Sequence, residues 1–242
     1  QLDAVITVEA DAGSYTGGEF ERAHPHLRYV SIPLIKFPAF HPDVCSAHGT
    51  GLEPIRLKYT SMIGVWAYRN KLSVQDAATA FNQATYANLG YLSLWEHCVE
   101  RLREAFDKSS LAEHFGRFYL RIKRLGLFMY SATHPRPEVL AEVAKLVALK
   151  LGKDEKSLNV DLPALDALSH FIWPVYPEIA QHLSVRSSGY VWQWPDEPRI
   201  EGVHRFLTHS FDQYRSRGLT PDSITVPGVD MDKVGRAVVH GH

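Results

Sequence analysis

The spacing of apolar positions predicts a chain in which helices outnumber strands. Two short, β-prone apolar runs, Ala4 to Val8 and Leu27 to Ile32, indicate strands near the start. Spacings of three and four residues dominate afterwards and are typical of helices with one buried face. We expect such helices over 61–69, 73–90, 92–106, 111–125, 137–150 and 203–217, and a short one from Pro177. The predicted fold class is therefore α/β and helix-rich.

Prolines and glycines divide this pattern. The stretch from Pro33 to Pro54 contains four prolines and reads as one long irregular loop, and long loops in compact domains are often functional. Ser73, with Asp76 three residues later, is expected to cap the helix that Gly90 ends. Val139, Leu140, Val143, Leu146 and Val147 are expected to face inward from the helix that begins at Pro137. Beyond Gly218 the sequence is rich in turn residues, so residues 219–242 are predicted to form a mobile tail.

Composition narrows the class of protein. The 242 residues suit a single domain, 1–242, and the net charge of −1 argues against nonspecific nucleic-acid binding. No apolar run approaches the roughly 18–20 residues that a membrane span needs. The two cysteines, Cys45 and Cys98, form no disulfide framework or metal motif, so a cytoplasmic location is expected. Because the chain begins at Gln1 and enters a strand at once, an N-terminal segment of the parent protein is expected to be missing.

Candidate chemistry is densest between Leu111 and Pro137. Arg117, Arg121 and Arg124 recur at i, i+4 and i+7, with Lys123 beside them, and form a basic stripe on one helix face. The apolar run 127–130 follows and leads into Ser131, Thr133 and His134. This order suggests an anion site beside an acid/base group. A solvated arginine face and a histidine bonded within a loop explain the same pattern.

Three further patterns each have two readings. His41 and Asp43 in the proline-rich loop could form an oriented general base, or Asp43 could cap a turn while His41 packs on Phe40. Tyr190, Trp192 and Trp194 could form a stacking platform for a sugar or adenine, or a half-buried edge strand. The pairs His24/His26 and His240/His242 have zinc-ligand types but no third ligand in a placed element, so we predict surface histidines and no metal site.

Four blocks in order resemble the WcbI-type polysaccharide biosynthesis proteins, regarded as acetyltransferases of capsule assembly. The blocks are Phe40-His41-Pro42-Asp43, then Phe81-Asn82 to Leu89-Gly90-Tyr91, then Leu127 to Pro135, then Trp173-Pro174-Val175-Tyr176-Pro177. The resemblance covers roughly residues 1 to 183. It implies a small sheet with a cradle of loops and helices that binds coenzyme A. The implied reaction transfers an acetyl group from acetyl-CoA to a hydroxyl of a sugar or polysaccharide, with other capsule-assembly enzymes as partners.

Acyl transfer of this kind assigns roles to the candidate residues. His134 or His41, the latter beside Asp43, would take the hydroxyl proton. Ser131 or Thr133 would hold the thioester oxyanion, and Arg117, Arg121, Lys123 and Arg124 would hold the coenzyme phosphates.

The chain also departs from the family pattern. Family members usually open with a strand that leads into a Gly-x-Cys-Gln turn, and this chain has nothing like that combination. Thr60 stands before Ser61 where a histidine is usual. There are two alternative functions. One is an SGNH-like esterase of polysaccharide, and the other is a noncatalytic module that binds a glycan through Trp192 and Trp194.

Overall fold

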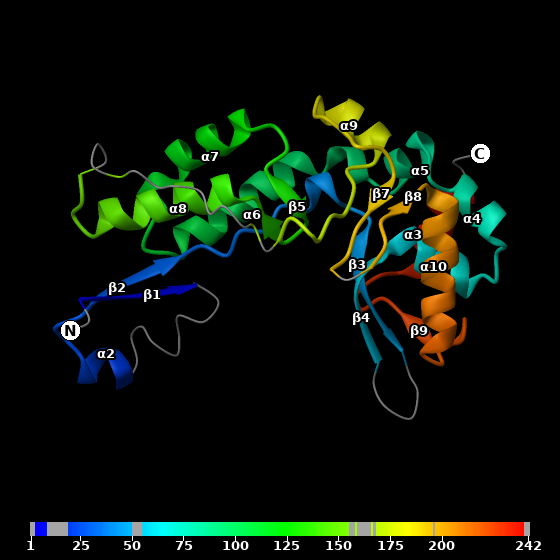
Figure 1. The fold of residues 1–242 in the computed structure, drawn as a ribbon, viewed down its shortest axis with the longest axis horizontal. Coiled ribbons are helices and arrows are strands. Elements are labelled where there is room, and N and C mark those ends of the chain that lie inside the picture. The colour runs from blue at the N-terminus through cyan, green and yellow to red at the C-terminus, as the bar shows by residue number, and fades with distance from the viewer. Residues whose placement is uncertain are drawn as a thin grey trace. The chain divides into compact units, whose positions relative to one another are not determined.

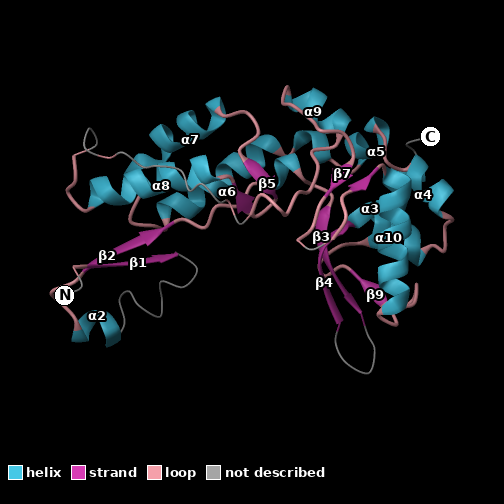
Figure 2. Ribbon diagram, in the orientation of Figure 1, coloured by secondary structure: helices cyan, strands magenta, loops and turns pink. Residues whose placement is uncertain are grey.

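The computed structural model describes residues 3–8, 19–49, 55–154, 158, 166, 168–195 and 197–239, which form two compact units (Figure 1). Unit 1 comprises residues 1–37 and 96–169, and unit 2 comprises 38–95 and 170–242. Figure 2 shows short strands and a majority of helices, so the helix-rich α/β class is confirmed. That residues 1–242 form a single domain stays a prediction. No helix in the described part of the chain combines the length and apolarity needed to cross a membrane.

Unit 1 is built on two parallel strands and a layer of helices. β1 (Ala4–Val8) pairs in parallel with β2 (Arg28–Ile32), as the two apolar runs predicted, and α2 (Glu19–Ala23) lies between them in sequence. α6 (Trp95–Asp107), α7 (Phe115–Arg124) and α8 (Pro137–Lys150) supply the helical layer, and β5 (Met129–Ser131) and β6 (His134–Pro135) form a tight hairpin. Phe106, Phe118 and Phe128 are fully buried in its core.

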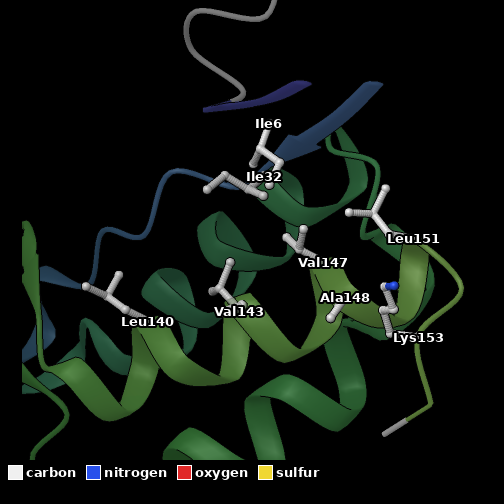
Figure 3. Close-up of a pocket in the computed structure, with 9 residues that line it drawn as sticks. Ile6, Ile32, Leu140, Val143, Val147, Ala148, Leu151 and Lys153 are labelled. Carbon is white, nitrogen blue, oxygen red and sulfur yellow. The ribbon is translucent and has the colours of Figure 1, made fainter. Parts of the chain in front are cut away.

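An apolar groove lies between the β1–β2 ladder and α8 (Figure 3). Ile6 and Ile32 point from the strands toward Val143 and Val147 of the helix, with Lys153 at one end. Leu140, predicted to be buried, is 48% exposed at this groove. The periodicity placed Leu140 correctly on the apolar face of α8, but the groove leaves about half of its side chain exposed.

Unit 2 contains an antiparallel sheet of order β4–β3–β9 and its covering helices. The strands are β3 (Val44–Gly49), β4 (Ile55–Ser61) and β9 (Ile224–Thr225). The helices are α3 (Met62–Arg69), α4 (Val74–Thr79), α5 (Gln83–Asn88), α9 (Pro177–Leu183), α10 (Val203–Ser216) and α11 (Met231–Val239). A second hairpin, β7 (Val191–Trp192) with β8 (Ile200–Glu201), packs Trp192 into the core beside Phe206.

Two sequence predictions about secondary structure in unit 2 were wrong. The stretch 33–54, predicted to be irregular, contains β3, because pairing with β4 and β9 stabilises a segment with weak strand propensity. The helix predicted from Ser73 to Gly90 is two helices. Ser73 caps α4 as expected, but the Asn82 side chain accepts a hydrogen bond from the N–H of Thr85 at 2.9 Å and starts α5.

Residues 219–239, predicted to belong to a mobile tail, contain β9 and α11. Leu219 is buried, β9 pairs with β3, and α11 packs against α3 and α5. Residues 240–242, with His240 and His242, lie outside the described part. The burial and pairing favour a segment that is packed on unit 2.

Packing of this segment can be tested at Gly49, the last residue of β3. A Cβ at position 49 would lie 1.9 Å from Cδ2 of Leu219, so we expect Gly49→Ala to lower the free energy of unfolding by about 1–3 kcal/mol. Leu219→Ala alone should cost about 2–5 kcal/mol. In the double variant the new methyl group occupies the vacated space, so the two costs should not add. Urea unfolding of all four proteins measures this coupling, and additive costs would mean that Leu219 does not pack on β3.

Candidate functional site

The most buried charged group in the described part of unit 2 is Asp43. It lies between the 3₁₀ turn Pro38–Phe40 and β3, and its side chain has no exposed surface. Its Oδ1 accepts hydrogen bonds from the Ile63 N–H at 3.0 Å and from the Tyr91 hydroxyl at 3.1 Å. Its Oδ2 accepts from the Ser61 hydroxyl at 2.5 Å and from the Tyr176 hydroxyl at 2.6 Å. Both carboxylate oxygens are therefore satisfied without a cation.

Local sequence explains how Asp43 meets the start of α3. Ser61 is the N-cap residue of α3, and its Oγ accepts the N–H of Gly64 while it donates to Asp43. The Asp43 backbone carbonyl accepts the N–H of Met62 at 2.8 Å. Asp43 thus satisfies N–H groups that every helix leaves without partners in its first turn. The positive end of the helix dipole stabilises the carboxylate in return.

Burial shifts the titration of this carboxyl group. Loss of hydration raises the pKa of Asp43 to about 6, although its hydrogen bonds from Ser61, Tyr176, Ile63 and Tyr91 favour the charged form and oppose the rise. Burial and the negative charge of Asp43 also raise the pKa of the Tyr91 and Tyr176 hydroxyls. Both tyrosines therefore act as neutral hydrogen-bond donors at physiological pH.

A second polar chain adjoins this cluster through stacked rings. The Tyr86 and Tyr190 hydroxyl oxygens lie 2.7 Å apart, and the Tyr190 hydroxyl donates to Oε2 of Glu178 at 2.8 Å. The Tyr86 ring is stacked on Tyr91 and lies 5.5 Å from the Tyr176 ring. We call the set of Asp43, Ser61, Tyr91 and Tyr176 the Asp43 cluster. Its aromatic surroundings exclude water, which strengthens each of its hydrogen bonds.

His41 shares a turn with Asp43 but is buried. The Val44 N–H donates to the His41 carbonyl at 3.2 Å, which closes a turn over residues 41–44. The imidazole is 2% exposed and meets the Phe40 ring edge-on at 6.2 Å. These contacts match the second reading of this loop, in which Asp43 acts as a cap and His41 packs on Phe40, and the role of His41 as a general base stays a prediction.

Unit 1 holds the other predicted catalytic residues in the β5–β6 hairpin. Ser131 pairs with His134 across the hairpin, and the Ser131 hydroxyl accepts the N–H of Thr133 at 3.5 Å. Ser131 is buried, Thr133 is exposed, and His134 is half-buried. Partial burial lowers the pKa of His134, so its imidazole is neutral at pH 7. The hairpin brings together the serine, threonine and histidine that the sequence singled out.

The basic stripe lies on α7 and is partly engaged by α8. Nη1 of Arg121 lies 2.8 Å from Oε2 of Glu142, whose other oxygen lies 2.7 Å from Nζ of Lys145. Burial alone would raise the pKa of Glu142, but the hydrogen bonds from Lys145 and Arg121 outweigh it and lower that pKa. Lys123 lies over the Tyr119 ring, and Lys123 and Arg124 are exposed while Arg117 is half-buried. Arg121 thus has a structural partner, and Arg124 is open to solvent.

Sequence reasoning missed most of the Asp43 cluster. Ser61 was expected only as a helix start, and Tyr91 and Tyr176 were not singled out as site residues. Both tyrosines nevertheless lie in the blocks 81–91 and 173–177. Three of the four blocks therefore meet at one carboxylate, a convergence that was available as a signal once the blocks were considered together. The fourth block forms the β5–β6 hairpin of unit 1.

The pair His24/His26, which the sequence predicted to lie at the surface, belongs to unit 1, where His24 is half-buried and His26 is exposed. The rings of His24 and His26 are 6.0 Å apart and nearly perpendicular. Within the described residues no group of three or more His, Cys, Asp or Glu side chains is placed to hold a metal ion.

The raised pKa of Asp43 predicts a pH-dependent loss of stability. Between about pH 4 and pH 6 the folded chain keeps a proton that the unfolded chain has released, so stability falls as pH rises through this window. The full change should be about 3 kcal/mol for a shift of about two pKa units. Asp43→Asn cannot ionise and should lose this component. The difference between wild-type and Asp43→Asn unfolding free energies, measured by urea titration from pH 4 to 7, should change across this window, whereas a constant difference would contradict the buried carboxylate.

Asp43→Ala separates ionisation from hydrogen bonding. An asparagine oxygen still accepts the fixed N–H of Ile63, and the hydroxyls of Ser61 and Tyr176 can rotate to accept from its amide. Alanine leaves all these donors unsatisfied, at a cost of about 1–3 kcal/mol for each buried group. We therefore expect Asp43→Ala to be much less stable than Asp43→Asn at pH 7.

Comparisons with known proteins agree with the resemblance. A family model described as the polysaccharide biosynthesis enzyme WcbI matches residues 19–156, more than half of the chain. The search of curated proteins found no match to this chain. A solved structure of WcbI has a similar fold, with a TM-score of 0.60 and 16% identity over 99% of this chain and 77% of that one. It is described as a novel polysaccharide biosynthesis enzyme, the native protein without a disulfide bond between coenzyme A and a cysteine. The present chain belongs to the WcbI family of polysaccharide biosynthesis enzymes.

Proposed function

We propose that this chain is a coenzyme A-binding acetyltransferase that acylates a sugar hydroxyl during capsular polysaccharide synthesis. Membership in the WcbI family carries the proposal, because it places the chain among polysaccharide biosynthesis enzymes. The mention of coenzyme A in the description of the similar structure supports the choice of cofactor. Acetyl-CoA is then the acyl donor, and a sugar or polysaccharide is the acceptor.

His134 is the proposed general base. Its lowered pKa keeps the imidazole able to accept a proton at neutral pH, and the hairpin holds it between β5 and Pro135. His134 would take the proton of the sugar hydroxyl as that oxygen attacks the thioester carbonyl. The carbon–sulfur bond then breaks, and the thiolate leaves with the proton from the imidazolium. His41 is the second candidate, although its burial means that the turn 41–44 would have to open before it met a substrate.

Stabilisation of the oxyanion is assigned to the same hairpin. The exposed Thr133 hydroxyl can donate directly to a thioester oxygen. Ser131 is buried and accepts the Thr133 N–H, so we propose that it positions the turn as well as offering its own hydroxyl. Asp43 is proposed to position the turn that carries His41, since its hydrogen bonds tie that turn to α3.

The coenzyme phosphates are assigned to the basic stripe of Arg117, Arg121, Lys123 and Arg124. Arg121 is also bound to Glu142, so it would hold a phosphate with its remaining donors. Arg124 is exposed and has no ion pair within the described part of the chain, which makes it the most accessible guanidinium of the stripe. Guanidinium groups suit this task because their planar donors match phosphate oxygens.

Coenzyme A binding is the first test of the proposal. Calorimetry should detect binding of coenzyme A and acetyl-CoA, and a ligand excess of about 100 times Kd should stabilise the fold by about 2.7 kcal/mol. Arg124→Ala should weaken binding by about 1–3 kcal/mol, the range for a charge-assisted hydrogen bond. Arg101→Ala on α6, an exposed arginine paired with Glu104, is the matched control and should bind normally. No heat and no melting shift with either ligand at millimolar concentration would rule out the cofactor assignment.

Substitution of His134 separates catalysis from binding. Glutamine is polar and of similar size but is no base near pH 7, so acetyl transfer should fall about 10²–10⁴-fold while the Kd for coenzyme A stays nearly unchanged. His41→Gln, assayed in parallel, distinguishes the two candidate bases. Normal turnover by folded His134→Gln, together with reduced thermal stability, would assign His134 a structural role instead.

A further inference from the structure

A polar pocket of unit 2, separate from the Asp43 cluster, lies between β4 and α10. Its volume is about 290 Å³, just below the roughly 300–1,000 Å³ that is usual for ligand pockets. Residues 56–60 of β4 form one wall. His209, Gln213 and Arg217 form the opposite wall, because their spacing of four residues places them on one face of α10. Trp194 and Glu197, from the connection between β7 and β8, complete it. The pocket has room for about one sugar ring.

A strained bulge shapes the β4 wall. Ala47 of β3 pairs with Leu57 and Cys45 pairs with Thr60, so Lys58 and Tyr59 both lie opposite the single residue Ser46. Tyr59 absorbs the extra residue with a left-handed backbone, φ 57°, which costs an L-residue roughly 1–2 kcal/mol. Strain of this kind persists where the surroundings require it, often at ligand sites. The bulge interrupts the alternation of the strand and lets consecutive residues of β4 line one pocket.

The charge of the pocket is predominantly positive. Arg56, Lys58 and Arg217 are exposed at it, and none of them forms an ion pair with any other residue that the structure describes. Glu197 is the acidic residue among those lining the pocket, and its Oε2 lies 3.3 Å from Nε2 of His209. Three cations facing one small cavity without carboxylate partners repel one another unless an anion joins them. This arrangement suits a ligand with a carboxylate or phosphate group.

An aromatic wall stands beside these charges. The Trp194 ring is stacked with His209 at 5.7 Å and is parallel to Phe206 within 8°. Phe206 is itself stacked on the buried Trp192 at 4.0 Å. Trp192 is buried in the core, whereas Trp194 is half-buried at the pocket, so the stacking reading of this aromatic stretch concerns Trp194 and stays a prediction. A rigid indole of this kind stacks on the apolar face of a sugar ring.

We propose that the β4–α10 pocket binds one acidic sugar residue, a uronic acid or a sugar phosphate. Arg56, Lys58 and Arg217 hold the anionic group, Trp194 stacks on the ring, and the Glu197–His209 pair and Gln213 accept and donate hydrogen bonds to hydroxyls. This is a binding claim about unit 2, and it does not depend on the acetyl transfer proposed above.

Titration of the whole chain with four small probes tests this pocket. Glucuronate, glucose 6-phosphate, neutral glucose and inorganic phosphate would be added while amide and indole NMR signals are followed. We expect at least one acidic sugar to shift the Trp194 indole signal, assigned by its loss in Trp194→Phe, and to bind at least about tenfold tighter than glucose and than phosphate. The better of the two acidic sugars identifies the anionic group as carboxylate or phosphate.

Matched variants connect the binding to the named residues. Arg217→Ala and Lys58→Ala should each weaken the acidic sugar about tenfold or more, and Trp194→Ala should weaken it too. Arg215→Ala is the control, since Arg215 lies on the same helix, exposed and paired with Asp212, and does not line the pocket. Melting curves verify that each variant folds. The proposal is overturned if no acidic sugar binds the wild type below about 100 mM, if glucose or phosphate alone binds as tightly, or if folded Arg217→Ala and Lys58→Ala bind like the control.

Discussion

A buried carboxylate, Asp43, which has no cationic partner among the described residues, governs the architecture of unit 2. An isolated charge in a protein interior costs several kcal/mol, so Asp43 can be buried only while its oxygens are fully hydrogen-bonded. The donors come from the start of α3, from Tyr91 and from Tyr176 just before α9. The carboxylate therefore fixes the relative positions of segments more than a hundred residues apart in sequence. The same hydrogen bonds also position the turn that carries His41.

The residues that meet at Asp43 lie in the blocks through which the chain resembles its family. Three of the blocks that resemble WcbI proteins supply Asp43, Tyr91 and Tyr176, and the fourth block forms the Ser131–His134 hairpin. The blocks 40–43, 81–91 and 173–177 thus support one hydrogen-bonded cluster in unit 2, whereas the hairpin offers hydroxyl and imidazole groups that are partly open to solvent. In the proposed acetyltransferase, positioning and proton transfer are therefore assigned to different parts of the sequence.

The basic residues of α7 and those of the β4–α10 pocket differ in whether carboxylates neutralise them. On α7, Arg121 is held by Glu142, which Lys145 also contacts, so part of the predicted stripe ties α7 to α8. At the β4–α10 pocket, Arg56, Lys58 and Arg217 have no such carboxylates among the described residues. Spacing along the sequence made the first group conspicuous and left the second invisible, because the second is assembled from a strand and the far end of a helix.

The sequence by itself determined the helix-rich α/β class, the strands β1 and β2, the Ser73 cap and the helix that begins at Pro137. These features depend on local periodicity and on capping, which act within a few residues. The sequence also indicated the family, because four blocks that resemble WcbI proteins occur in the expected order along the chain. Tertiary structure decided that residues 44–49 form a strand, that Arg121 pairs with Glu142, and that Tyr91 and Tyr176 donate to Asp43. Only long-range pairing and burial set these features, and neither leaves a periodic signal in the segments concerned.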